Sequence, residues 1–267
     1  MTMSETRTTK PDVSKHFTSS ILLWMRTDKP RQQGMDRWKG PHSGIISATS
    51  GLFEYRQIHL AEHNPGRWPA IEGVETTIPE DRKIDGIAEV TFDNALSPLA
   101  GRKQTALAYE DEVNIFRRTL LHAGPPGTSR WYAVAPGEKP GSRAIIYLRR
   151  AKGQGTIGFH KFFKKELTPA LIATGELKEL RTQVFLPWNE KTWDTPNVAH
   201  DNPKDQHLHA SVILGFTDDT ARDAFYTTHA LDLSTLLAPH VSAIHAYDVA
   251  TALTYVTDSK ILPRYQE

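Results

Sequence analysis

A helix-to-strand segment occurs twice in this chain, at a spacing of 125 residues. The first copy covers residues 34–60 (GMDRWKGPHSGIISATSGLFEYRQIHL) and the second covers residues 159–185 (FHKFFKKELTPALIATGELKELRTQVF). Without any gap, five residues in the short window over residues 48–56 are identical to their counterparts: Ala48, Thr49, Leu52, Glu54 and Arg56 match Ala173, Thr174, Leu177, Glu179 and Arg181. A chance likeness is the alternative, but the order of the surrounding elements also repeats. We therefore predict an internal duplication.

The first half of the chain is predicted to run strand, helix, strand, strand, helix, strand. Short apolar or alternating runs predict strands at residues 19–25, 52–60, 84–92 and 130–134. Apolar side chains at three- and four-residue spacing predict a helix through Met35, Trp38, His42 and Ile46, and helices are also expected over residues 94–108 and 109–121. Proline and glycine break residues 61–83 into a long loop.

The second half repeats this order after a proline- and glycine-rich breaker at residues 136–141. Strands are predicted at residues 144–149, 177–186, 207–216 and 241–249, helices at 156–173 and 218–227, and a second long loop at 187–205. Each half has the split strand-helix-strand pattern of a ferredoxin-like unit, whose open sheet face needs an apolar partner. We predict an α+β fold in which two ferredoxin-like repeats, residues 16–137 and 138–267, pack their antiparallel sheets face to face as an internal pseudo-dimeric alpha-beta barrel. A pocket is expected between the sheets.

Composition excludes several classes of function. Lys and Arg total 32 against 31 Asp and Glu, so net charge gives no reason to expect nucleic acid or a membrane surface as a partner. The absence of cysteine excludes disulfides, thiolate zinc sites and a cysteine nucleophile. Residues 1–15 are polar and lack the apolar run of a signal peptide, and no apolar stretch is long enough to span a bilayer. These features predict a cytoplasmic protein with a disordered tail at residues 1–15.

Three local signatures in the first half resemble the EthD-like family of the dimeric alpha-beta barrel superfamily. They are Gly51-Leu52 followed by Tyr55 and His59, Asp85-Gly86 followed by Glu89 and Phe92-Asp93, and Asp111 followed by Phe116. The family helix carries Trp and then His-Gly-Pro, whereas here Lys39 precedes Gly40-Pro41, and His42 follows the proline. The resemblance implies a barrel enzyme acting on a small molecule, with its histidine chemistry altered at this point.

Polar residues at alternate positions on the second strand are the leading candidates for a site. Tyr55, Gln57 and His59 share one strand face, which is an unusual concentration of polar groups for a buried surface. If that face lines the barrel, His59 could act as a general acid or base, with Tyr55 and Gln57 orienting a substrate. The alternative is that His59 lies near solvent and Tyr55 is an ordinary packing residue.

Other residues are secondary candidates. His42 lies on the apolar stripe of the first helix, where it could be catalytic or simply a core residue bonded to a carbonyl. Asp85 could face the pocket or form a structural ion pair, because an isolated buried carboxylate is costly. Trp24, Trp38 and Trp68 would make apolar walls for a substrate, although tryptophans commonly serve as core anchors.

A histidine pair in the second half supports a different hypothesis. His207 and His209 alternate on a predicted strand, and such a pair could ligate a metal, while a histidine of a tandem barrel could ligate haem. Dye-decolorising peroxidases and chlorite dismutases are tandem barrels of the same superfamily, but the Gly-x-x-Asp-Gly peroxidase signature is absent from the sequence. Exposed edge histidines are the simpler interpretation.

The sequence therefore predicts an enzyme without an organic cofactor or metal, acting by proton transfer on a hydrophobic, oxygenated small molecule in the barrel pocket. Isomerisation, cyclisation, dehydration or another lyase step would fit. The alternatives are a haem- or metal-dependent oxidoreductase and a non-catalytic binding protein. Exposed barrel edges are also compatible with a homodimer.

Overall fold

Two similar units make up the described part of the protein. The structure is a computed structural model that describes residues 11–267, except the side chains of residues 99, 100 and 102. The first unit contains β1 (Val13–Met25), α1 (Arg31–Arg37), α2 (Ser43–Ser47), β2 (Leu52–Leu60), β3 (Gly86–Phe92), α3 (Ser97–Ala100), α4 (Arg102–Glu112), β4 (Phe116–Ala123) and β5 (Ser129–Tyr132). The second contains β6 (Ser142–Arg150), α5 (Thr156–Phe162), α6 (Thr168–Ala173), β7 (Glu179–Val184), β8 (Ala210–Phe216), α7 (Asp219–Thr228), α8 (Ala230–Leu237), β9 (Val241–Thr257) and β10 (Lys260–Gln266).

The strands close into one antiparallel barrel. In the first unit β4 and β5 both pair with β1, followed by β3 and β2; in the second the order is β9, β6, β8, β7. Each order is that of a ferredoxin-like unit. Pairing of β2 with β9 and of β5 with β7 joins the two units into a closed barrel. The predicted α+β pseudo-dimeric barrel is confirmed, and its two halves are joined edge to edge through strand hydrogen bonds.

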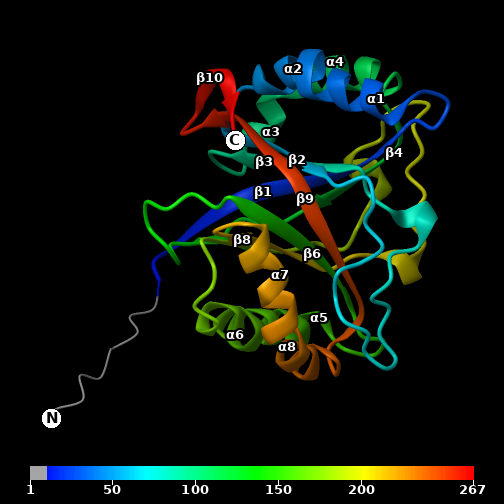
Figure 1. Cartoon of the computed structure of the whole chain (residues 1–267). Helices are drawn as coiled ribbons and strands as arrows, with labels where there is room; N and C mark the ends of the chain where they lie inside the picture. Colours follow the sequence, from blue (N-terminus) through cyan, green and yellow to red (C-terminus); the bar gives the residue numbers. More distant parts are fainter. Residues whose placement is uncertain (1–10) are drawn as a thin grey trace, which may run out of the picture.

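Helices cover the barrel on two opposite sides. Figure 1 shows α1, α2 and α4 above the strands and α5 to α8 below them, with the two long loops gathered on one flank. Three apolar clusters follow from this arrangement. One lies under the helices of the first unit around Trp38 and Tyr55, one under those of the second around Phe162 and Leu214, and one inside the barrel around Ile58 and Tyr147. Both faces of most strands are therefore buried.

The principal helix of each unit is widened at the same place. A π-helical turn covers Trp38–His42 in the first unit and Phe163–Leu167 in the second, again 125 residues apart. Pro41 lies inside the first turn and Pro169 lies two residues after the second, and neither can donate the amide hydrogen bond of a regular helix. Widened turns of this kind are often found at functional sites.

The residues shared by the two copies form a reciprocal ionic network inside one end of the barrel. Arg56 donates to Glu179 (2.7 Å) and Glu89 (2.9 Å), while Arg181 is paired with Glu54. Each repeat thus supplies the arginine that neutralises the other repeat's glutamate. Burial opposes the charge on Arg56 and Glu179, but their partners raise the pKa of Arg56 and lower that of Glu179. Both side chains remain ionised.

Several sequence-based predictions need correction. Residues 116–121 are strand β4, not helix, because Phe116–Ala123 pairs with β1. His207 and His209 precede β8, which begins at Ala210. The hairpin formed by the end of β9 and β10 was not predicted. Part of the predicted tail lies outside the described residues, and Val13–Lys15 belongs to β1. The predicted unit boundary at residues 137 and 138 falls between β5 and β6.

No helix in residues 11–267 combines the length and the apolar character that crossing a membrane would require.

Candidate functional site

The polar face of β2 is turned toward the helices of the first unit. Tyr55 belongs to the apolar cluster beneath these helices, whereas its strand neighbours Ile58 and Leu60 belong to the cluster inside the barrel. Gln57 donates to the backbone carbonyl of Trp38 (2.8 Å), which is in the widened helical turn. The prediction that Tyr55, Gln57 and His59 share a face is correct, but placing that face in the barrel interior is wrong.

Gln57 is the centre of a hydrogen-bond chain across this interface. Its amide nitrogen donates to the Trp38 carbonyl and to the Tyr55 hydroxyl (2.8 Å each). Its oxygen lies 3.0 Å from His59 Nε2 and 3.2 Å from the Tyr255 hydroxyl. Because the carbonyl of Trp38 can only accept, the amide orientation is fixed, and His59 must carry its proton on Nε2 to donate to Gln57.

These groups are neutral near pH 7. Burial, assisted by the positive charges of Lys39 and Arg31, lowers the pKa of His59 to about 3. Burial also raises the pKa of Tyr55 and of Tyr255 well above the ordinary value for a phenol. His59 is therefore a hydrogen-bond donor through Nε2 and a weak base in this packing. Tyr255 keeps its proton and donates it to the Lys39 carbonyl (2.8 Å) or to the Gln57 oxygen (3.2 Å).

Trp38 covers the chain of polar groups from the helix side. Its indole stacks on the His59 ring, with centroids 4.4 Å apart, and lies edge-on to Phe116. A Cβ atom at Gly86 would lie 2.4 Å from the indole, so only glycine at this position of β3 lets Trp38 lie flat on the sheet. Packing against Trp38 thus explains the glycine of the Asp85-Gly86 signature.

A second polar group surrounds His42. Its Nδ1 lies 3.0 Å from the Asp111 carboxylate, which also binds Arg37, and its ring meets Phe116 edge-on. The hydrogen bond from His42 and the Arg37 charge lower the pKa of Asp111, although burial opposes this shift. The carboxylate orients the imidazole so that Nε2 is its basic nitrogen. Asp111 and Phe116 therefore join the residues of β2 at one interface.

An open groove leads to this interface. It has a volume of about 780 Å³ and lies between the widened helix, including Lys39, Ser43 and Ser47, and the β10 hairpin, including Leu262 and Tyr265. A Cβ atom at Gly40 or Gly44 would meet no other atom within 4 Å, so the helical wall is open. Tyr255 lines the groove and also contacts Gln57, which connects the groove to the buried polar chain.

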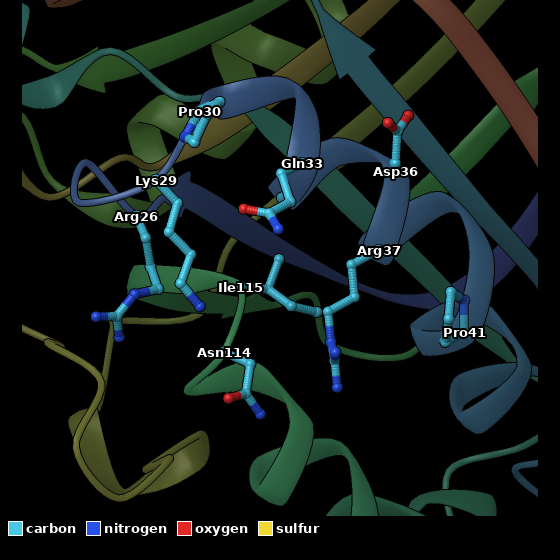
Figure 2. A pocket seen from close by; sticks show the side chains of 10 residues that line it. Arg26, Lys29, Pro30, Gln33, Asp36, Arg37, Pro41, Asn114 and Ile115 are labelled. Atoms are coloured by element: carbon cyan, nitrogen blue, oxygen red, sulfur yellow. The ribbon is translucent and has the colours of Figure 1, made fainter.

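A smaller, basic pocket approaches the same unit from the other end of α1. It has a volume of about 400 Å³ and is lined by Arg26, Lys29 and Arg37 together with Asp36, Asn114 and Ile115 among others. In Figure 2, Arg26 and Lys29 lie on one side of the pocket, and Arg37 extends from α1 past Ile115 on the other. Since Arg37 also binds Asp111, an anion in this pocket would compete with the Asp111 carboxylate for the Arg37 guanidinium.

The remaining predicted site residues lie elsewhere. Trp24 is inside the barrel, and Trp68 packs in the core of the second unit, where its indole donates to Ser234 (2.9 Å). Asp85 is ion-paired with Arg31 (2.6 Å) and accepts from the Met25 amide, so it fastens α1 to the sheet. The structure therefore does not place these three residues with His59.

The histidine pair is not arranged as a metal site. His207 Nε2 lies 2.9 Å from the Asn202 carbonyl, and His209 Nδ1 accepts from the Arg150 amide (3.2 Å). Among residues 11–267 no group of three metal-ligating side chains is found. Neither of the two larger cavities, at 780 and 400 Å³, is lined by a histidine, so they offer no axial ligand for haem. A smaller cavity of about 150 Å³ is lined by His160, His207 and His209.

Tyr255 and Arg37 are site residues that sequence reasoning missed. Tyr255 lies in the part of β9 beyond residue 249, where the alternation of Leu253 and Tyr255 was a usable signal. Arg37 could not be recognised from sequence, because its role depends on the meeting of α1 with the end of α4.

Comparison with known proteins identifies the class of fold. No protein-family model matches the chain, and no curated protein matches its sequence. A protein from Lactobacillus acidophilus NCFM assigned as a monooxygenase is similar in structure, with a TM-score of 0.52 and 11% identity over 95% of this chain and 100% of that one. An anthrone oxidase-like protein matches with a TM-score of 0.55 and 8% identity over 91% and 96% of the two chains.

A further match is a protein from Fusobacterium nucleatum subsp. nucleatum ATCC 25586, also assigned as a monooxygenase, with a TM-score of 0.54 and 7% identity over 95% and 99% of the two chains. At these identities the similarity establishes the fold alone. The chain has the dimeric alpha-beta barrel fold, with both halves of the barrel in one polypeptide.

Proposed function

We propose that this protein is an enzyme that acts by proton transfer on a hydrophobic, oxygenated small molecule bound in the groove of the first unit. The observation that carries the proposal is the hydrogen-bond chain from Tyr255, which lines the groove, through Gln57 to His59. A structural core has no need of such a chain, and the second unit has an apolar interface at the same place. We also propose that the first unit is related to the EthD-like family and that the protein is cytoplasmic.

The groove suits a ligand with an electron-rich oxygen atom, because the cationic side chains of Lys39 and Arg264 also line it. Ile261, Leu262 and Pro263 provide apolar surface, while Ser43, Ser47 and the Tyr255 hydroxyl provide polar contacts. The single proton of the Tyr255 hydroxyl points to the Lys39 carbonyl (2.8 Å) or to the Gln57 oxygen (3.2 Å). Turned toward a ligand carbonyl in the groove, the same proton would make the neighbouring C–H bond more acidic. Gln57 and His59 act as positioning residues that hold this hydroxyl.

The group best suited to accept a proton is His42. Its Nδ1 is engaged by Asp111, which leaves Nε2 as the basic nitrogen. His42 is only 3% exposed, so the packing around the widened helical turn must open for a ligand to reach it. Enolisation, isomerisation, cyclisation and dehydration all begin with such a proton transfer.

The test is deuterium exchange in a panel of aromatic ketones, including tricyclic anthrone-type compounds, incubated with the protein in D₂O and followed by NMR. We expect exchange at the enolisable carbon, which is the carbon next to the carbonyl in an alkyl aryl ketone and the methylene carbon opposite the carbonyl in an anthrone, and a loss of about 10- to 100-fold in Tyr255→Phe. Tyr247→Phe is the matched control, because the Tyr247 hydroxyl is inside the barrel. Equal rates in the two variants would refute the assignment of Tyr255.

Oxygenation is the second candidate, because the three structural neighbours carry monooxygenase or anthrone oxidase-like names. Oxygen uptake measured alongside deuterium exchange separates the two reactions. Ligand binding with neither exchange nor uptake across the panel would instead favour a non-catalytic binding protein.

A further inference from the structure

A set of buried polar groups without partners lies inside the barrel, at the end opposite the ionic network. Four side chains line a cavity of about 30 Å³ there: Trp24, His122, Arg149 and Asn202. Each is at least nine-tenths buried, with exposed fractions of 2%, 1%, 9% and 9% respectively. Trp24 Nε1, both ring nitrogens of His122, Arg149 Nε and Asn202 Nδ2 have no hydrogen-bond partner among the described residues.

Nearly all of these unpartnered atoms are donors. The indole, guanidinium and amide nitrogens can only donate, and a neutral imidazole supplies one further donor and one acceptor. Burial lowers the pKa of His122 to about 3, so the ring is neutral near pH 7. A buried donor without a partner costs about 1–3 kcal/mol, and several around one cavity call for a shared acceptor.

The surrounding charges do not supply that acceptor. Arg149 donates from its two terminal nitrogens to Glu75 (3.2 Å) and Gln206 (2.9 Å), which leaves only Nε for the cavity. Glu75 is also bonded to His245 (2.7 Å). Asp201 is ion-paired with Arg118 and Arg82, so its carboxylate is also engaged. The Arg118 guanidinium lies over the Trp24 ring.

We propose that this cavity binds a chloride-sized anion. The N–H donors and the apolar side chains of Leu22, Ile84 and Leu120 that line the cavity together form the kind of surrounding in which a halide is readily held. The cavity is close to the volume of a single water molecule, about 30 Å³, which excludes phosphate, sulfate and organic acids. The bound anion would fasten together β1, β4, β6 and the loop carrying Asn202. This site is separate from the proposed catalytic groove.

Thermal unfolding provides the first test. In a titration of sodium chloride against sodium gluconate at constant ionic strength, Tm should rise and then saturate, by roughly 3 °C when chloride exceeds its Kd about tenfold. Trp24→Phe should lose most of this rise. Trp38→Phe is the matched control, because the Trp38 indole N–H is also buried and unpartnered but lies outside the cavity, and it should keep the rise.

Crystals of the wild-type protein grown with sodium bromide provide the second test and do not depend on any variant folding. An anomalous peak within hydrogen-bonding distance of Trp24 Nε1 and Arg149 Nε would support the proposal. Ordered water in the cavity without an anomalous peak would overturn it, as would a Tm that depends equally on chloride and gluconate.

Discussion

The two repeats have the same backbone plan but opposite chemistry where the principal helix meets the sheet. In the first repeat this interface contains Trp38, His42, Tyr55, Gln57 and His59. At the positions 125 residues later stand Phe163, Leu167, Leu180, Thr182 and Val184, and all except Thr182 belong to the apolar core of the second repeat. One copy of the duplicated interface is packed as a core, and the other has kept or acquired polar groups that connect to a groove.

Inside the barrel the comparison is reversed, since the repeats are alike there. Glu54 and Arg56 of the first repeat correspond to Glu179 and Arg181 of the second, and each pair neutralises the other. The shared residues therefore hold the two repeats together, and the divergent residues separate a functional interface from a structural one. Four experiments test this division.

The largest expected effect comes from breaking the reciprocal ionic network. Arg56→Met would leave Glu89 and Glu179 buried beside fewer positive charges, and we expect the free energy of unfolding to fall by about 3–5 kcal/mol in urea denaturation. Arg143→Met is the control, because Arg143 also binds Glu179 (2.7 Å) but lies nearer to solvent. A similar small loss in both variants would contradict a network centred on Arg56.

The second effect is on activity, under the proposed function. Gln57→Leu removes the hub that joins Tyr255 to His59, and we expect kcat/KM to fall about 100-fold. Tm should also fall, because the buried Trp38 carbonyl and His59 Nε2 lose their partner. Thr182→Val changes the equivalent position of the second repeat and should alter kcat/KM less than threefold. Comparable losses in the two variants would remove the functional distinction between the repeats.

The third effect concerns the packing of Trp38 on the sheet. Gly86 is paired with His59 in the β2–β3 ladder. In the second repeat the counterpart of His59 is Val184, and its partner in the β7–β8 ladder is Ala210. Gly86→Ala places a methyl group against the Trp38 indole, so we expect a loss of about 2 kcal/mol in the free energy of unfolding and weaker stacking on His59. Near-ultraviolet circular dichroism would report the change in the indole environment. An unchanged spectrum and Tm would show that Trp38 does not depend on glycine.

The fourth effect is a pH dependence, which is small near pH 6.5 and grows as the pH falls. Because burial lowers the pKa of His59 to about 3, this residue stays neutral in the folded protein but takes up a proton near pH 6.5 when unfolded. Stability should therefore fall as pH decreases from about 6.5 toward 3, by up to about 1.4 kcal/mol per pH unit from this residue. His59→Val, which copies Val184, should flatten the profile by that amount. The free energy of unfolding is measured by urea denaturation at pH 7 and pH 5. An equal loss between these pH values in the wild type and in His59→Val would contradict a buried, neutral His59.

Local sequence patterns predicted an element correctly where only one type of secondary structure fits the pattern. The strand predicted at residues 52–60 has those bounds, and the helix predicted at 156–173 is continuous through its π turn. Residues 116–121 failed because Ile115, Leu120 and Leu121 suit a helical face as well as a strand. Pairing of β4 with β1 resolves that ambiguity, and this contact joins residues about 100 positions apart.

The site shows the same division between local and tertiary information. Alternation along β2 by itself determined that Tyr55, Gln57 and His59 share a face, and the repeat by itself determined that two similar units are joined. Only the tertiary structure decided which face of β2 meets the helix. Both faces of this strand are buried, one by Trp38 and the other by the barrel interior, so polarity along the strand cannot distinguish them. In the closed barrel Glu54 and Arg56 point into the interior. Tyr55, Gln57 and His59 lie on the opposite face, beneath the widened helix that borders the groove.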